Sequence, residues 1–224
     1  MLSSQTRVVS TSHRSGQGIT NESHQCVRNH LRFFNLWLQN PTNIGAVVPS
    51  GKNLGVAMAA EIDPAAPGAV IELGGGTGSI TSALLLRGIA PQDLVVVERE
   101  PSLCKIMRTR FPHIHVICGD ARELGQLLAV AGISQVKAIV SGLPLLSLSK
   151  DVERDILRQC FNALPPEGFM VQFTYVPRPP VGRSIAVGLN LKATRTAWVL
   201  DNFPPASVWV YRRRAVDPAL RQIA

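Results

Sequence analysis

A glycine-rich stretch lies where the chain has to turn sharply, and its composition suits the binding of a ligand. Three apolar residues and Glu72 lead into GGGTG at 74–78, and a run typical of a helix follows from 79 to 87. Glycines allow positive φ angles and let a ligand approach the backbone, while the start of a helix offers unpaired N–H groups. The G-x-G-x-x-G pattern of dinucleotide sites fails here, because the sixth residue counted from Gly74 is Ser79. The stretch therefore favours a cofactor that is not a dinucleotide.

Polar residues also stand at the ends of three later predicted strands, and these are Glu98, Asp120 and Ser141. In an open parallel sheet, ligands bind at the carboxyl ends of the strands. A carboxylate at Glu98, 20 residues after Gly78, can accept hydrogen bonds from both hydroxyls of a ribose. Asp120 can recognise the edge of an adenine through its carboxylate or through the backbone N–H beside it. A single acid at a strand end is usually structural, but Glu72, Glu98 and Asp120 at successive strand ends predict a nucleoside-containing cofactor.

Alternating apolar strands and helices would bring these residues together at one edge of a parallel sheet. The predicted strands are 70–73, 94–98, 115–118, 137–140 and 169–175, and the predicted helices are 50–62, 79–87, 101–110, 121–131 and 150–163. Residues 176–190 are rich in Pro and Gly and show no helical period. The runs 193–200 and 207–214 then predict a β-hairpin that closes the sheet. The expected fold is α/β and Rossmann-like, with seven strands.

The first 40 residues differ in composition from the rest of the chain. Residues 1–23 are rich in Ser, Thr, Gln, Gly and Asn and predict a flexible tail. Residues 24–40 predict a basic amphipathic helix that carries Phe34 and Trp37, as expected of a helix lying in a lipid interface. A helix packed on a protein core has the same periodicity. We therefore divide the chain into a tail, this helix and a globular domain at 41–224.

The net charge of +8 is concentrated at the two ends of the chain. Residues 1–40 contain four arginines and one acid, residues 41–150 contain nine bases and eight acids, and residues 151–224 contain ten bases and six acids. This distribution suits contact with a polyanion, which is either nucleic acid or an anionic membrane face. No apolar run reaches the roughly 18 residues that span a bilayer, and the N-terminus has no apolar signal-peptide core. We therefore expect a protein that does not cross a membrane.

The cysteines and histidines indicate no metal site. The cysteines are far apart, without a C-x-x-C pair, and they are Cys26, Cys104, Cys118 and Cys160. The last three lie in apolar stretches and predict small core residues in a reducing cytosol. His113 and His115 flank a predicted strand without metal-ligand partners nearby, so we interpret them as structural.

Seven segments resemble, in this order and at these separations, the bacterial phospholipid N-methyltransferases. They are IGAVVPS, VIELGGGTG, VVVERE, CGDA, SGLPLLS, PEGFMVQFTY and NFPPASVW, within about residues 28–214. The E-x-G-x-G-x-G pattern that begins at Glu72 resembles motif I of the class I S-adenosylmethionine-dependent methyltransferases. Two features depart from the family. Gly75 stands where proline is common, and the polar tail before residue 24 is unlike a compact start.

This resemblance implies a methyltransferase domain at 41–224 that methylates phosphatidylethanolamine stepwise towards phosphatidylcholine. The implied cofactor is S-adenosylmethionine, with S-adenosylhomocysteine as product, and residues 24–40 correspond to the membrane-binding helix of the family. The implied partners are phosphatidylethanolamine and an anionic membrane, at the cytoplasmic inner face of the cell membrane, and not nucleic acid. The oligomeric state is left open. The matching motifs place the cofactor against Ser50, Glu72, Gly74, Gly76, Thr77, Gly78, Glu98, Arg99, Asp120, Ala121 and Ser141.

The segment SGLPLL, which begins at Ser141, bears on the acceptor. It resembles the N-x-P-Y motif of amino-directed methyltransferases, with Ser141 in place of asparagine and Leu145 in place of the tyrosine that stacks on a flipped base. The missing ring argues against an adenine acceptor. Ser141 would then align the amine, and Tyr175 would hold the head group and favour cationic intermediates, although strand-end tyrosines are also common packing residues. Arg178 and Arg183 are candidates for the lipid phosphate, or ordinary solvated charges.

Two other readings remain open at this point. Ribosomal RNA adenine N6-dimethyltransferases share motif I, the acidic strand ends, the closing hairpin with its Pro-Pro turn and a basic balance. Against them stand Leu145 and the absence of a helical domain after Arg214. The third reading is a membrane-peripheral binding protein without catalysis. The intact set of Glu72, Glu98 and Asp120 argues against it.

Overall fold

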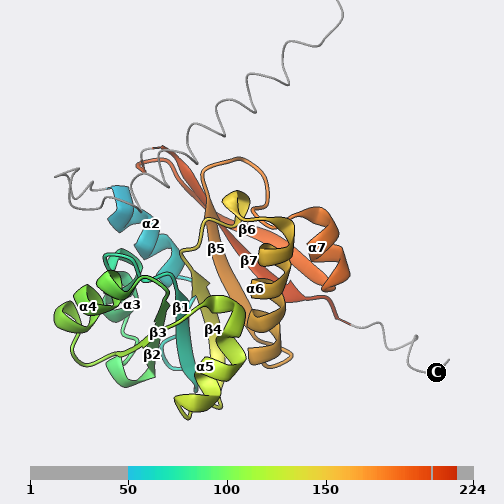
Figure 1. Ribbon diagram of the computed structural model, residues 1–224. Helices are drawn as coiled ribbons and strands as arrows, with labels where there is room; N and C mark the ends of the chain where they lie inside the picture. The colour runs from blue at the N-terminus through green and yellow to red at the C-terminus, as the bar shows by residue number, and fades with distance from the viewer. Residues whose placement is uncertain (1–49, 203, 216–224) are drawn as a thin grey trace, which may run out of the picture.

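A sheet of seven strands runs through the protein in the order β3-β2-β1-β4-β5-β7-β6 (Figure 1). The computed structural model describes residues 50–202 and 204–215. The strands are β1 Ala69–Leu73, β2 Leu94–Glu98, β3 His115–Cys118, β4 Val136–Ser141, β5 Phe169–Thr174, β6 Leu191–Val199 and β7 Ala206–Arg213. The first five are parallel, and β7 pairs antiparallel with both β5 and β6. The predicted α/β fold with its C-terminal hairpin is confirmed.

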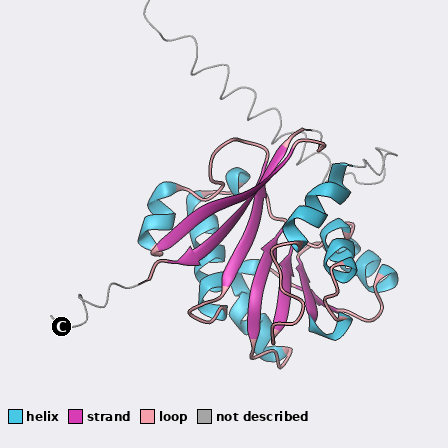
Figure 2. Ribbon diagram, turned by 180° about the vertical axis from the view of Figure 1, so that it is seen from behind, coloured by secondary structure: helices cyan, strands magenta, loops and turns pink. Residues whose placement is uncertain are grey.

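Helices cover both faces of the sheet (Figure 2). They are α2 Ser50–Ala59, α3 Ser79–Leu86, α4 Pro101–Arg110, α5 Leu124–Val130, α6 Lys150–Ala163 and α7 Arg183–Gly188, with short 3₁₀ turns at Pro91–Asp93, Ala121–Glu123 and Leu145–Ser147. Successive strand residues point to opposite faces. Ile71 packs in the core under α5, α6 and α7, whereas Val70 packs in the core under α2 and α3. This is why the central strands are apolar at consecutive positions.

The structure corrects the sequence predictions in three places. Residues 183–188 form α7 inside the stretch that showed no helical period; this helix is too short to display a period, and it is positioned by the buried Ile185. The predicted helix at 121–131 begins as a 3₁₀ turn before α5. Cys118 is exposed, because β3 is an edge strand with only one neighbour, whereas Cys104 and Cys160 are buried as predicted.

Several predictions concern residues outside the described part of the chain. They include the tail at 1–23, the amphipathic helix at 24–40 and its Phe34 and Trp37. The predicted boundary at 41 also lies outside it. In residues 50–202 and 204–215, no helix is both long and apolar enough to cross a membrane.

Candidate active site

The strand register gathers the ends of neighbouring strands at one edge of the sheet (Figure 1). Leu73 on β1 lies beside Ser141 on β4, and Ser141 lies beside Gln172 on β5. On the other side, the N–H of Gly119 donates to the carbonyl of Glu98 at 2.9 Å, so the chain leaving β3 stays next to β2. The predicted site residues at these strand ends therefore lie along one edge.

Three glycines of the loop after β1 need backbone angles that other residues rarely adopt. The φ angles of Gly74, Gly76 and Gly78 are 76°, 52° and 86°. A Cβ on Gly78 would lie 2.3 Å from the ring of Phe111, whereas nothing lies within 4 Å of a Cβ on Gly76. Gly78 therefore lets α4 pack against the loop, and Gly76 leaves a backbone surface open to a ligand.

Residues of α4 and β2 hold the other two loop positions, Gly75 and Thr77, in place. A Cβ on Gly75 would lie 2.4 Å from Cγ1 of Val96, so a proline here would require Val96 to move. This contact gives a physical reason for the departure from the family pattern at Gly75. Arg110, at the end of α4, donates to the carbonyl of Thr77 at 2.6 Å. Thr77 is therefore held through its backbone, and its side chain is half-buried.

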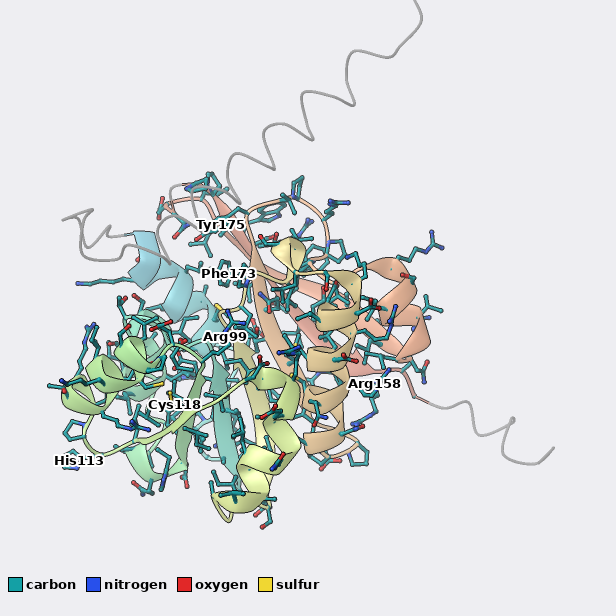
Figure 3. The ribbon with its side chains drawn as sticks, viewed as in Figure 1. Arg99, His113, Cys118, Arg158, Phe173 and Tyr175 are labelled. Atoms are coloured by element: carbon teal, nitrogen blue, oxygen red, sulfur yellow. The ribbon has the colours of Figure 1, made fainter. Side chains whose placement is uncertain are left out.

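Glu98, at the end of β2, is hydrogen-bonded to the glycine loop. Its Oε2 accepts a hydrogen bond from the N–H of Gly76 at 3.0 Å, and its Oε1 accepts one from the N–H of Glu100 at 2.9 Å. The side chain is only 8% exposed. Each carboxylate oxygen can accept a second hydrogen bond, so the group fits the two hydroxyls of a ribose. Arg99 beside it is exposed at the same edge (Figure 3).

Glu72 is fully buried between β1 and α3. Its Oε2 accepts a hydrogen bond from the hydroxyl of Thr81 at 2.6 Å, and its Oε1 has no hydrogen-bond partner among the described residues. Burial raises the pKa of Glu72 from 4.5 to about 8. A buried acceptor with a vacant lone pair next to the glycine loop fits a cationic donor such as an ammonium group.

Asp120 is committed to the turn that follows it. Its Oδ1 accepts hydrogen bonds from the backbone N–H of Arg122 at 2.9 Å and from Nε of Arg122 at 3.1 Å, and its Oδ2 accepts one from Nη2 at 2.9 Å. The side-chain hydrogen bonds with Arg122 hold the pKa of Asp120 below its usual value. Of the two options that the sequence left open for adenine, this favours the backbone beside Asp120, at Ala121, over the carboxylate.

The loop after β4 packs directly on the glycine loop. A Cβ on Gly142 would lie 2.9 Å from the carbonyl oxygen of Gly74, so the two backbones meet because neither residue has a side chain. Ser141 is 1% exposed, and its hydroxyl accepts a hydrogen bond from the N–H of Leu143 at 3.3 Å. Counted back from Pro144, the asparagine of N-x-P-Y falls on Gly142, which corrects the assignment to Ser141.

Gln172 supports this loop from β5, and the sequence analysis missed it. Its side chain is 1% exposed, and its Nε2 donates to the carbonyls of Leu143 at 3.0 Å and Phe173 at 3.1 Å. A single amide inside a mainly apolar strand was the available signal. Leu145 is 2% exposed and belongs to the core, so it presents no stacking surface at the loop.

Comparison with known proteins assigns the chain to a family. A family model described as a methyltransferase domain matches residues 70–168. The ornithine lipid N-methyltransferase of Singulisphaera acidiphila is 32% identical over 154 residues, which are 67% of this chain and 80% of that protein. This chain belongs to the lipid N-methyltransferase family. It is a class I S-adenosylmethionine-dependent methyltransferase.

Two further likenesses agree with the fold of this methyltransferase. The ribosomal RNA small subunit methyltransferase A of Synechococcus sp. (strain JA-3-3Ab) is 34% identical over 98 residues, which are 42% of this chain and 31% of that protein. The 1,6-didemethyltoxoflavin-N1-methyltransferase of Burkholderia thailandensis, solved with bound S-adenosylhomocysteine, has a TM-score of 0.60 at 12% identity and covers 92% of this chain and 94% of that chain. The family and these folds establish S-adenosylmethionine as the cofactor.

The stability of the methyltransferase without its cofactor is expected to fall with rising pH, between pH 4.5 and about 8, because the pKa of Glu72 is raised by burial. In this window the folded protein keeps a proton that the unfolded chain releases. The free energy of unfolding therefore decreases by up to about 1.4 kcal/mol per pH unit and levels off above the raised pKa. Urea unfolding at several pH values measures the slope. Glu72→Gln keeps an acceptor for Thr81 and should flatten it; an equal slope in both proteins would contradict the assignment.

Tyr175 is the first residue after β5, and it is half-buried. Its ring meets that of Phe173 edge to face, with centroids 5.4 Å apart and an angle of 74° between the planes. In Figure 3, the labelled Phe173 and Tyr175 lie at the same end of the strands as Arg99. Burial raises the pKa of Tyr175, and a hydrogen bond with the side chain of Asn202 opposes the rise. Asn202 comes from the β6–β7 hairpin and was not a predicted site residue.

The two arginines predicted to meet a lipid phosphate lie on separate elements. Arg178 is exposed in the loop after β5. Arg183 is the exposed first residue of α7 and not a loop residue. The loop between them is fixed at its far end, because the N–H of Gly182 donates to Oε1 of the buried Glu153 at 2.7 Å.

Ser50, which the sequence predicts to contact the cofactor, is the first residue of α2.

Proposed function

We propose that this methyltransferase transfers methyl groups to the amine of a membrane lipid, with phosphatidylethanolamine and its methylated intermediates as acceptors and phosphatidylcholine as the end product. The observation that carries the proposal is the 32% identity to a protein named for N-methylation of ornithine lipid, over 80% of its length. That relative also makes an ornithine lipid the second candidate acceptor. Both lipids present a primary amine at the polar end of an amphiphile.

The arrangement of the site supports an amine acceptor through orientation and exclusion of water. S-adenosylmethionine supplies an electrophilic methyl group on a sulfonium, so the protein needs to hold a neutral amine in line with it. The contact between Gly142 and Gly74 puts the loop after β4 directly against the cofactor loop. Ser141 accepts a hydrogen bond from the N–H of Leu143, and Gln172 donates one to the carbonyl of Leu143. These two bonds fix the backbone of that loop. Burial of the amine at this end of the sheet would lower the cost of keeping it uncharged.

Tyr175 is proposed to face the head group with its ring. Because burial raises the pKa of Tyr175, its phenol stays protonated near neutral pH and does not serve as the base that deprotonates the substrate ammonium. An aromatic face attracts methylated ammonium groups, which stay cationic after the first transfers. This role would favour the later methylation steps over the first one.

A transfer assay with radiolabelled S-adenosylmethionine tests the acceptor. We expect label in lipid when the protein meets anionic liposomes that contain phosphatidylethanolamine or ornithine lipid, and none in undermethylated ribosomal RNA. Tyr175→Leu should lower the rate of the second and third transfers by about tenfold, while Tyr175→Phe retains them. Label only in RNA would overturn the proposal in favour of the adenine dimethyltransferase reading, with which the chain shares a 98-residue match.

A further inference from the structure

The tip of the β6–β7 hairpin exposes two large apolar side chains at the edge of the sheet that carries the active site. Trp198 is 47% exposed and Leu200 is 71% exposed. Trp198 pairs with Ser207 on β7, and Ser207 pairs with Thr174 on β5, so these three residues form one row across the strands. With strands about 4.8 Å apart, this row places Trp198 roughly 10 Å from the residue that precedes Tyr175.

The tip is held in place by polar contacts. The guanidinium of Arg195 lies 4.4 Å from the centroid of the Trp198 ring and 5.5 Å from that of Trp209. Asn202 is 3% exposed and donates to the carbonyl of Pro204 at 2.7 Å, and its side chain also reaches Tyr175. The exposed indole is therefore presented on a supported element that is tied to the acceptor end of the site.

The charged side chains of the segment that leads to this tip are all positive. Residues 176–200 contain no acid, and their four bases are Arg178, Arg183, Lys192 and Arg195. All four are exposed. Asp201 follows at the tip as the first acid. An exposed indole, an exposed leucine and surrounding arginines are the composition that binds at the head-group level of an anionic bilayer.

We propose that the tip defined by Trp198 and Leu200, together with Arg178 and Arg195, docks into the head-group layer of an anionic membrane and sets the active-site edge against it. This inference rests on the proposed lipid acceptor. It assigns the docking to the catalytic domain itself, on the hairpin whose Asn202 reaches Tyr175. A lipid amine would then reach the cofactor without leaving the interface.

Co-sedimentation of the full chain with vesicles of phosphatidylglycerol and phosphatidylcholine tests this surface. The double variant Trp198→Glu, Leu200→Glu should bind about tenfold or more weakly, because two apolar groups become charged. The matched control is Leu86→Glu, Val130→Glu. Both of its residues are 84% exposed. They lie at the C-terminal ends of α3 and α5, near where the next strands, β2 and β4, begin, and therefore away from the strand ends that form the active-site edge. Equal binding of the double variant and the wild type would overturn the proposal, and so would an equal loss in the control.

Tryptophan fluorescence gives a second readout at the residue itself. In a Trp37→Phe chain, the remaining indoles are Trp198 and the 8% exposed Trp209. Anionic vesicles should shift the emission to the blue, and brominated lipids should quench it. Further replacement with Trp198→Phe should abolish both effects. Emission that brominated lipids leave unchanged would place Trp198 outside the membrane and overturn the proposal.

Two more measurements separate this proposal from the proposed function. If the wild type methylates no lipid but loses vesicle binding in the double variant, the acceptor assignment fails and the docking surface stands. If the wild type methylates lipid and the double variant is unchanged on vesicles, the docking surface fails alone. A fall in molar mass from dimer to monomer in the double variant, measured by light scattering, would overturn docking in favour of a contact between two copies.

Discussion

Replacing Glu98 with alanine is expected to weaken the binding of S-adenosylmethionine about 100-fold, which corresponds to about 2.7 kcal/mol. The substitution removes the carboxylate that fits the ribose hydroxyls. It also releases the N–H of Gly76, which Glu98 holds at 3.0 Å, so the loop after β1 loses its tie to β2. Isothermal titration calorimetry with the purified protein measures the dissociation constant.

Two control substitutions, one at Glu98 and one at Glu100, test whether the effect comes from the carboxylate of Glu98. Glu98→Gln keeps one acceptor oxygen. Its affinity for S-adenosylmethionine should lie between those of the wild type and Glu98→Ala, about tenfold weaker than in the wild type. Glu100→Ala removes the exposed acid two positions further along the chain and should leave binding unchanged. An unaltered dissociation constant in Glu98→Ala would show that the ribose is bound elsewhere and that the end of β2 is not part of the cofactor site.

Gly78→Ala is expected to destabilise the fold by about 3 kcal/mol, the largest effect on stability among these substitutions. Gly78 has a φ of 86°, and a Cβ on it would lie 2.3 Å from Cε2 of Phe111. Backbone strain and a steric clash therefore act together, and relief of the clash requires Phe111 to leave the loop. Urea unfolding followed by circular dichroism measures the difference.

The control for this prediction separates strain from clash. Gly132 has a φ of 71°, but nothing lies within 4 Å of a Cβ on it, so Gly132→Ala should cost only about 1 kcal/mol. The pair Gly78→Ala, Phe111→Leu should recover part of the stability that Gly78→Ala loses. Equal costs at Gly78 and Gly132 would mean that the ring moves freely and that α4 does not clamp the loop.

The predicted bounds of β2, α4 and α6 are those that the structure has. Continuous apolar residues predicted β2, and the helix predicted at 101–110 is α4, which has Pro101 in its first turn. Helix α6 begins after Ser149, whose hydroxyl accepts a hydrogen bond from the N–H of Val152. These signals lie within a few residues of the element that they define. The helix α7 lacked such a signal, because six residues held mainly by the packing of Ile185 show no period.

The sequence alone determined the chemistry of the cofactor loop and the order of the strand ends. A failed dinucleotide pattern, together with Glu72, Glu98 and Asp120 at successive strand ends, predicted a nucleoside cofactor on a parallel sheet. Those features are local, since positive φ angles and apolar periodicity are properties of a short stretch of chain. The seven segments that include them carried the family resemblance that the comparisons confirmed.

Only the tertiary structure decided which partners these residues have. It placed Gln172 under the carbonyl of Leu143, which is 29 positions away in the chain, and set Trp198 at the active-site edge. The position of Trp198 depends on the order in which β5, β7 and β6 pair, and that of Gln172 depends on the pairing of β4 with β5. No short stretch of sequence contains that information, because each contact joins elements that meet only after the sheet has formed.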